Sequence, residues 1–109
     1  MANRSFDFGK LKRSFYTTRL KDKRVLVVEM PQKSTFEKMQ ELSSIGENVD
    51  GEDTYNSMLA LMAEILSNNR AKTKITADYL AKEGYNIEDI VAYINDYANF
   101  VKSIKSNPN

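Results

Sequence analysis

Hydrophobic and polar positions change their spacing once along this chain. Near the N-terminal end, two short runs, Ser14–Leu20 and Val25–Met30, are rich in aromatic and β-branched residues, which favours β-strands. The residues Lys21–Arg24 between them form a short charged turn, so the two runs predict a β-hairpin. An isolated hairpin is at best marginally stable in water, and we therefore expect this one to pack on the rest of the chain.

After the hairpin, the apolar spacing becomes helical. Ser34 and Glu37 have the spacing of a capping box at the start of a first helix, and Gly46 ends it. A polar, acidic loop is expected from Glu47 to Asp53. A second helix then follows the i, i+3, i+4, i+7 rule, with Leu61 off the apolar stripe. That stripe consists of Tyr55, Met58, Leu59, Met62, Ile65 and Leu66.

Two further helices are marked by residues that typically cap helix ends. Thr76 caps a short third helix, which Gly84 ends. Asn86 caps the last and longest helix, and Asp89 in its first turn favours the positive end of the helix dipole. The core-facing stripe of this last helix is Ile87, Ile90, Val91, Ile94, Tyr97, Ala98 and Val101.

The order of these elements predicts an α+β fold, with an N-terminal β-hairpin followed by a bundle of three to four helices. With 109 residues, the chain fits a single domain over 1–109. We expect residues 1–13 to be a flexible basic lead-in, 14–31 to form the hairpin and 34–105 to form the helical part.

The composition narrows the classes of function. Histidine and cysteine are both absent, which removes the usual general base, the usual zinc ligands and the usual activated nucleophile. Glycine-rich phosphate loops and nucleophile motifs are also absent, so we expect a protein that is not an enzyme and uses no cofactor or metal. The polar start, Met1–Lys10, is unlike a signal peptide, and no apolar run reaches the ~18 residues of a membrane span. We expect a soluble cytoplasmic protein without a membrane partner.

The net charge is +1, but the charges are unevenly spread. Residues 1–40 contain ten Lys or Arg against four Asp or Glu, residues 41–70 contain one against six, and residues 71–109 contain five of each. One interpretation is simply solvated faces. The other is self-association or docking onto an acidic partner. In the second interpretation, Lys21, Lys23 and Arg24 at the hairpin tip are the candidate charged contacts.

The last helix has more apolar surface than one core face needs. Tyr93, Tyr97, Phe100 and Ile104 form a second line beside the core stripe. Either the hairpin covers this line, or the line is a protein-binding groove or oligomer seam, where aromatic residues are enriched. In the second case these four residues are the candidate partner-binding site, with Met58 and Met62 as lesser candidates because methionine adapts to irregular partners.

Two other functions are disfavoured by charge and spacing. Ile75–Ile94 resembles a helix-turn-helix, but its second helix begins Asn86-Ile87-Glu88-Asp89 and has no Lys or Arg before Asp96. Phosphates would be repelled, so we expect no specific nucleic-acid binding. The acidic cluster Asp50-Gly51-Glu52-Asp53 lacks the glutamate that a calcium-binding EF-hand loop needs at position twelve, which is Leu61 here.

The order of segments resembles the tail assembly chaperones of long-tailed phages and prophages of Gram-positive bacteria. The resemblance rests first on Asp7-Phe8-Gly9-Lys10-Leu11-Lys12-Arg13, followed by a hairpin that closes in Glu29-Met30-Pro31 and a helix that opens with Ser34-Thr35-Phe36. It continues with Met58-Leu59-Ala60-Leu61-Met62-Ala63-Glu64-Ile65-Leu66-Ser67-Asn68-Asn69, a basic link, Ile75-Thr76 and a final helix containing Tyr93, Tyr97 and Phe100. It covers most of the chain and consists of patterns of size and order.

This resemblance implies a role in phage tail morphogenesis. Chaperones of this family bind and shield the tape measure protein, with the major tail protein as a second partner. They are released when the tube assembles and do not remain in the virion. Many are also made in a longer, frameshifted form. Two alternatives remain open, a minor structural tail component such as a connector or completion protein, and a small nucleic-acid-binding regulator.

Overall fold

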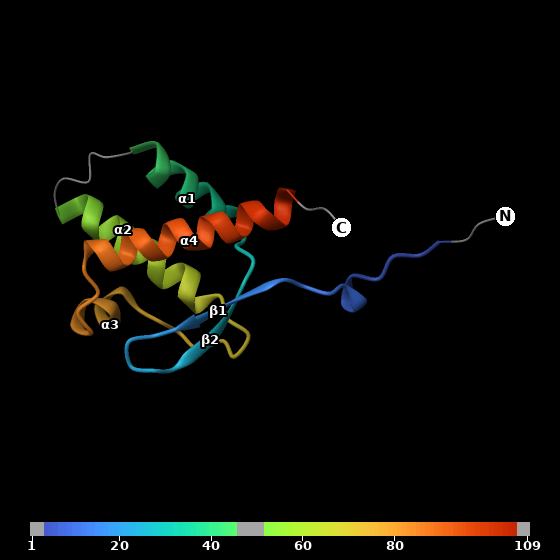
Figure 1. Cartoon of the computed structure of the whole chain (residues 1–109), viewed down its shortest axis with the longest axis horizontal. Helices are drawn as coiled ribbons and strands as arrows, with labels where there is room; N and C mark the ends of the chain where they lie inside the picture. Colours follow the sequence, from blue (N-terminus) through green and yellow to red (C-terminus); the bar gives the residue numbers. More distant parts are fainter. Residues whose placement is uncertain (1–3, 46–51, 107–109) are drawn as a thin grey trace.

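A computed structural model describes residues 4–45 and 52–106 and confirms the predicted α+β fold. A two-stranded antiparallel hairpin precedes four α-helices (Figure 1). The elements are the short 3-10 helix η1 (Phe8–Lys10), strands β1 (Phe15–Arg19) and β2 (Val25–Glu29), and helices α1 (Lys33–Ile45), α2 (Glu52–Ser67), α3 (Ala77–Lys82) and α4 (Ile87–Ser106).

The hairpin lies where the sequence predicts it, with both strands slightly shorter than expected. Phe15 pairs with Glu29 and Arg19 with Val25. The turn is closed by the Leu20 N–H, which donates to the Arg24 carbonyl at 2.8 Å, and by the Lys23 N–H, which donates to the Leu20 carbonyl at 2.9 Å. Within this turn Lys23 has φ of +76°, a left-handed conformation that suits glycine better than lysine.

Helix α2 is the centre of the molecule. It contacts α1, α3, α4 and β2, so it is buried on more sides than a single apolar stripe would allow. Leu61, which lies off the predicted stripe, is nevertheless only 2% exposed, because α1 also packs on α2 and residues of α1 such as Leu42 lie beside Leu61. The core residues on α2 are Met58, Leu59, Leu61, Met62, Ala63, Ile65 and Leu66.

The helix ends test the predicted caps. Helix α1 begins at Lys33, one residue before the predicted cap, because the Gln32 carbonyl already accepts from the Phe36 N–H at 2.9 Å. The predicted stop at Gly46 lies outside the described residues, as does most of the acidic loop, while α2 begins at Glu52 inside that loop's expected range. The loop's boundary is therefore earlier than predicted.

The caps of α3 and α4 are confirmed. The Thr76 side chain accepts from the Tyr79 N–H at 3.1 Å. Asn86 and Asp89 form a reciprocal capping box, in which each backbone N–H donates to the other's side chain at 3.0 Å. Between the two helices Gly84 has φ of +82°, and a residue with a side chain would be strained there.

Residues 68–70, just after α2, form backbone hydrogen bonds with β2. The Glu29 N–H donates to the Asn68 carbonyl at 2.9 Å, and the Arg70 N–H donates to the Val27 carbonyl at 3.0 Å. The outer edge of β2 is therefore paired with residues 68–70. The buried Asn69 side chain fixes this segment through three hydrogen bonds of 2.8 to 3.0 Å with backbone groups of Leu66 and Thr73.

Candidate protein-binding site

The hairpin covers most of the second apolar line of α4. Tyr97 is fully buried, and Tyr93 and Phe100 are half-buried against the core. Tyr16 of β1 lies over the line, with its ring centroid 5.8 Å from Tyr93, 5.4 Å from Tyr97 and 5.2 Å from Phe100. Of the two interpretations that the sequence left open, the structure therefore favours coverage by the hairpin for these three aromatic residues.

Hydrogen bonds fasten the hairpin to the same helix. The Tyr97 hydroxyl donates to the Glu29 carbonyl at 2.6 Å. The Thr18 and Tyr93 hydroxyls lie 2.8 Å apart, and the Tyr16 hydroxyl donates to the carboxylate of Asp96. Burial raises the pKa of Tyr93 to about 12 and is also the main cause that raises the pKa of Tyr16 and Tyr97. These tyrosines stay protonated near neutral pH. Tyr16 and Tyr97 serve as structural donors, and Tyr93 shares one hydrogen bond with the Thr18 hydroxyl.

The lesser candidates on α2 also lie in the core. Met58 is 7% exposed and Met62 is 3% exposed. Together with Tyr97, they are not accessible to a partner in this structure. Ile104, near the end of α4, is the most exposed residue of the predicted partner-binding set, at 36%.

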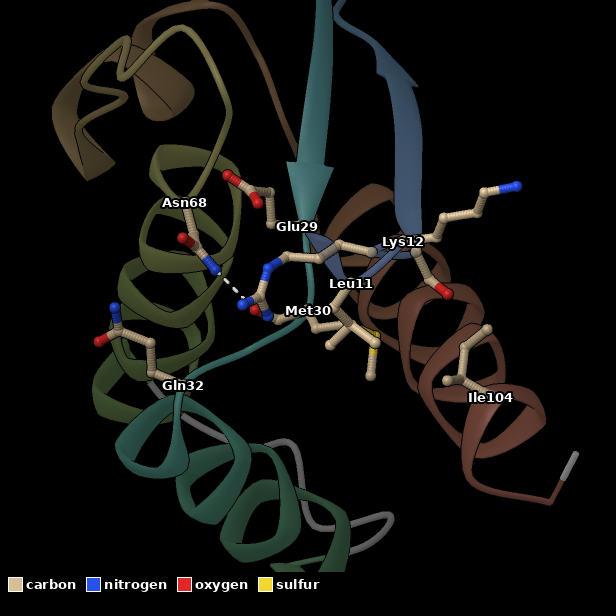
Figure 2. A pocket seen from close by; sticks show the side chains of 9 residues that line it. Leu11, Lys12, Glu29, Met30, Gln32, Asn68 and Ile104 are labelled. Atoms are coloured by element: carbon tan, nitrogen blue, oxygen red, sulfur yellow. Dashed lines mark hydrogen bonds between the residues drawn. The ribbon is translucent and has the colours of Figure 1, made fainter. Parts of the chain in front are cut away.

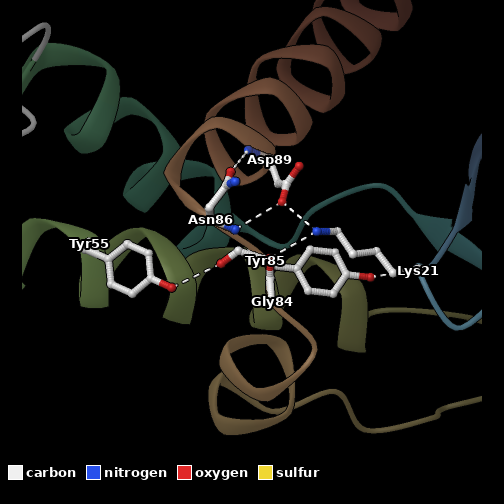
Figure 3. Close-up of polar contacts among 6 residues, drawn as sticks. All are labelled: Lys21, Tyr55, Gly84, Tyr85, Asn86 and Asp89. Carbon is white, nitrogen blue, oxygen red and sulfur yellow. Dashed lines mark hydrogen bonds and ion pairs between the residues drawn. The ribbon is translucent and has the colours of Figure 1, made fainter.

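Two of the three charged residues at the hairpin tip have partners within the chain. The Lys21 ammonium donates to the Asp89 carboxylate at 2.8 Å and to the Gly84 carbonyl at 3.0 Å (Figure 3). Its backbone N–H donates to the Tyr85 hydroxyl at 2.8 Å. The hydrogen bond from Lys21 is the main cause that lowers the pKa of Asp89. Lys21 therefore joins the hairpin tip to the start of α4.

The side chain of Arg24 contacts residues of the hairpin and of the neighbouring α3. Its guanidinium donates to Asp22 at 2.9 Å and lies 5.3 Å from the centroid of the Tyr79 ring. The Tyr79 hydroxyl donates to the same Asp22 carboxylate. Lys23 is exposed at the tip, so it is the predicted charged contact that faces solvent most freely.

Sequence reasoning missed an apolar surface on the N-terminal segment. Residues 4–14 extend away from the helices beyond β1 (Figure 1). The side chains of Phe6, Phe8 and Leu11 are 68%, 70% and 44% exposed, and the two Phe rings pack edge to face at 4.8 Å. We call these three residues the arm surface. Their apolar character was visible in the sequence, but the basic residues around them favoured the interpretation as a solvated lead-in.

The arm surface continues into a groove on the body of the protein. The groove, of about 340 Å³, lies between the base of the arm, the end of β2 and the end of α4 (Figure 2). Leu11, Met30 and Ile104 supply its apolar lining, while Lys12 and Glu29 are among its polar residues. The groove thus joins the exposed residue of the predicted α4 line to the arm.

The charge near the arm surface is positive. Arg4, Lys10, Lys12 and Arg13 are all exposed on residues 4–14, and Asp7 is the single acidic residue of that range. Asp7 accepts from the Gly9 N–H at 2.9 Å and so caps η1. An apolar surface with basic neighbours suits an apolar partner segment that has acidic flanks.

Within residues 4–45 and 52–106, the structure shows no group of three or more Asp or Glu side chains that could hold a metal ion. The same described ranges contain no helix that is long and apolar enough to cross a membrane. The arrangement instead defines a small α+β protein with an exposed apolar and basic surface. Comparison with protein-family models, with curated proteins and with solved structures finds no match to this chain. The resemblance to tail assembly chaperones stays a prediction.

Proposed function

We propose that this chain is a phage tail assembly chaperone that works in the cytoplasm of the host bacterium. It binds the tape measure protein, shields its apolar segments during tail morphogenesis and is released when the tube assembles. The observation that supports this proposal is the arm surface, because Phe6 and Phe8 are each about two-thirds exposed and touch each other away from the core. Exposed apolar clusters of this kind are typical of protein-binding surfaces.

The arm surface replaces most of the α4 line as the proposed site. Tyr97, Met58 and Met62 fill the protein's own core, so their apolar surface is already in use. Ile104 remains part of the site because it lines the same groove as Leu11. The half-buried Tyr93 and Phe100 belong to the contact between the hairpin and α4.

The size of the arm surface fits a partner that must be released. Fully burying one large apolar side chain contributes about 1.5–3 kcal/mol. Because Phe6, Phe8 and Leu11 are 68%, 70% and 44% exposed, covering their exposed parts contributes roughly 3–5 kcal/mol. Part of this is offset by the lost freedom of two associating molecules and of the ordered arm. The expected affinity is therefore moderate, which suits a chaperone that tail-tube subunits displace.

The direct test is co-expression with the longest helix-rich protein encoded beside this chain. We expect the partner to remain in the soluble fraction and to co-purify with the chain. The double substitution Phe6→Ala and Phe8→Ala should abolish this rescue while leaving the circular dichroism spectrum unchanged, because neither ring packs in the core. The matched control is Val25→Ala, which removes an apolar side chain that is 50% exposed on the hairpin.

Two results would contradict the proposal. If the partner is equally soluble without the chain, no chaperone is needed. If the double substitution rescues as well as the wild-type chain does, the arm surface is not the site. Mass spectrometry of purified particles separates a chaperone, which should be missing from the virion, from a connector or completion protein, which should be present in it.

The basic arm gives the nucleic-acid-binding alternative one supporting observation, the four exposed cations Arg4, Lys10, Lys12 and Arg13. That alternative predicts binding to a DNA duplex that weakens steeply with salt. A chaperone held by apolar contacts predicts a partner complex that persists at high salt. Measuring both complexes at about 50 mM and about 500 mM salt distinguishes the two functions.

A further inference from the structure

The backbone of β1 has one edge that bonds to β2 and one that faces outward. In an antiparallel pair, the N–H and carbonyl of one residue point to the same side, and this side alternates along the strand. Val27 and Glu29 bond to residues 68–70, so Leu26 and Val28 bond to β1. The register pairs these two with Thr18 and Tyr16. The N–H and carbonyl groups of Phe15, Thr17 and Arg19 consequently point away from the sheet.

This outer edge of β1 is uncovered in the part of the chain that the structure describes. The sheet contains only β1 and β2, and the additional bridge pairs Val28 with Asn69 on the opposite side. No backbone hydrogen bond from another described segment reaches Phe15, Thr17 or Arg19. The arm continues beyond β1 and does not fold back over it (Figure 1). One edge of the sheet is thus closed and the other is open.

Proteins commonly protect such an edge with proline, a bulge, a very short strand or charged side chains. The five residues of β1, Phe15–Arg19, contain no proline, and the register runs without a bulge. What the edge does carry is positive charge, with Arg19 in the strand and Lys12 and Arg13 just before it, all exposed. Two such edges from two copies of the chain would bring like charges together, which disfavours their pairing.

We propose that the open edge of β1 binds an extended, acidic segment of a partner protein by adding it to the sheet as a third strand. The outward N–H and carbonyl groups of Phe15, Thr17 and Arg19 supply the backbone hydrogen bonds. The basic residues select for acidic side chains on that segment and against a second copy of β1. The identity of the partner rests on the proposed function. If the partner is the tape measure protein, the open edge of β1 holds its non-helical stretches.

The side chains beside the edge also favour an added strand in which apolar and acidic residues alternate. On one face, Tyr16 lies against α4 beside the half-buried Tyr93 and Phe100. On the other face, Phe15 is 47% exposed and Arg70 lies 4.5 Å from its ring centroid. Apolar residues of the added strand would extend the first surface, and acidic residues would lie beside Arg19 on the second.

The test uses the full-length chain and a synthetic peptide of about seven residues in which valine and glutamate alternate. We expect binding that perturbs the amide resonances of Phe15, Thr17 and Arg19 in ¹⁵N NMR spectra more than those of the arm. The same peptide with lysine in place of glutamate should bind at least about tenfold more weakly. A peptide N-methylated at alternate amides cannot pair with the edge and should not bind.

A pair of substitutions at Thr17 isolates the backbone contribution. Thr17→Pro removes one outward N–H that the hairpin itself does not use, and proline is tolerated at such a position on an edge strand. Thr17→Val keeps the N–H and is the matched control. The loss of one hydrogen bond should weaken peptide binding about threefold to tenfold for Thr17→Pro, with Thr17→Val close to the wild-type chain. Circular dichroism verifies that both variants are folded.

A second pair of substitutions isolates the contribution of charge to peptide binding. Arg19→Glu should weaken binding of the acidic peptide and strengthen binding of the lysine peptide, each severalfold. Lys82→Glu, which makes the same charge change in the last turn of α3, a helix that is not part of the sheet, should alter neither. Equal binding of both peptides, or equal effects of Arg19→Glu and Lys82→Glu, would overturn the assigned partner chemistry.

The outcomes also separate this proposal from the proposed function. If Thr17→Pro binds the peptide as well as Thr17→Val does, or if the chain alone forms dimers that perturb the same amides, the edge proposal is overturned. The chaperone function would then still stand if the co-expressed partner is rescued and the arm substitutions abolish that rescue. If peptide binding behaves as expected but no tail protein is rescued, the edge proposal stands and the chaperone assignment fails.

Discussion

Tyr97 offers the sharpest test of whether α4 packs the core or binds a partner. Its side chain is fully buried against Tyr16, and its hydroxyl donates to the Glu29 carbonyl. Replacing a buried aromatic residue by alanine typically costs about 3–5 kcal/mol, whereas removing the hydroxyl alone costs about 0.5–1.5 kcal/mol. Since domains are stable by about 5–15 kcal/mol, Tyr97→Ala should remove a large part of the free energy of unfolding and Tyr97→Phe only a small part.

The matched comparison is Ile104→Ala, seven residues further along the same predicted line of α4. Ile104 is 36% exposed and loses only part of a side-chain burial on replacement, so stability should change by no more than about 1–1.5 kcal/mol. The assay is urea unfolding at 25 °C followed by far-ultraviolet circular dichroism, which reports the helices. If Tyr97→Ala and Ile104→Ala differ by less than about 1 kcal/mol, the hairpin does not cover α4 in solution. The α4 line would then return as the binding surface.

Three further predictions concern single residues. Asn69→Ala should lower stability by about 2–4 kcal/mol in urea unfolding, because its side chain bonds three backbone groups of a buried turn; a change below about 1 kcal/mol would contradict this role. Lys23→Gly should raise the unfolding temperature by a few degrees, since the gain from relieving a φ of +76° exceeds the backbone entropy cost of glycine; a lower temperature would be evidence against strain. Burial raises the pKa of Tyr93 from the usual tyrosine value of about 10 to about 12, so the unfolded chain loses this proton first and stability falls as pH rises from 10 towards 12. Urea midpoints across that range should fall less for Tyr93→Phe than for the wild-type chain, and an identical slope would refute the assignment.

Local patterns were sufficient to predict the hairpin and the caps of α3 and α4, but placed the start of α1 one residue late. Strand and cap formation depend on residues within a few positions of each other, as in the reciprocal bonds between Asn86 and Asp89. The same locality explains why the hairpin turn at Lys21–Arg24 was recognised from four charged residues. These features need no knowledge of the tertiary packing.

The partner of each apolar surface could not be predicted from spacing. A wide apolar arc on α4 is compatible with a covering hairpin or with a foreign protein, and only the position of Tyr16 distinguishes them. Leu61 lies off the apolar stripe, and its burial could not be predicted because the spacing along one helix does not reveal a neighbour on the other side of that helix. The spacing also does not reveal that the backbone and side chains at the end of α2 and just after it, at Ser67 and Asn68, join this helix to Ile75 and to the end of β2.

The contact between the hairpin and α4 also sets an order of events during synthesis. The Tyr97 hydroxyl and the Glu29 carbonyl that it bonds are 68 residues apart in the chain. At a translation rate of about 5–20 residues per second, roughly 3 to 14 s separate the emergence of these two groups from the ribosome. During that interval, the inner face of the hairpin, including Tyr16 and Thr18, lacks the helix that covers it in the finished fold. The nascent chain itself therefore passes through a stage in which its first folded element depends on the last helix for protection.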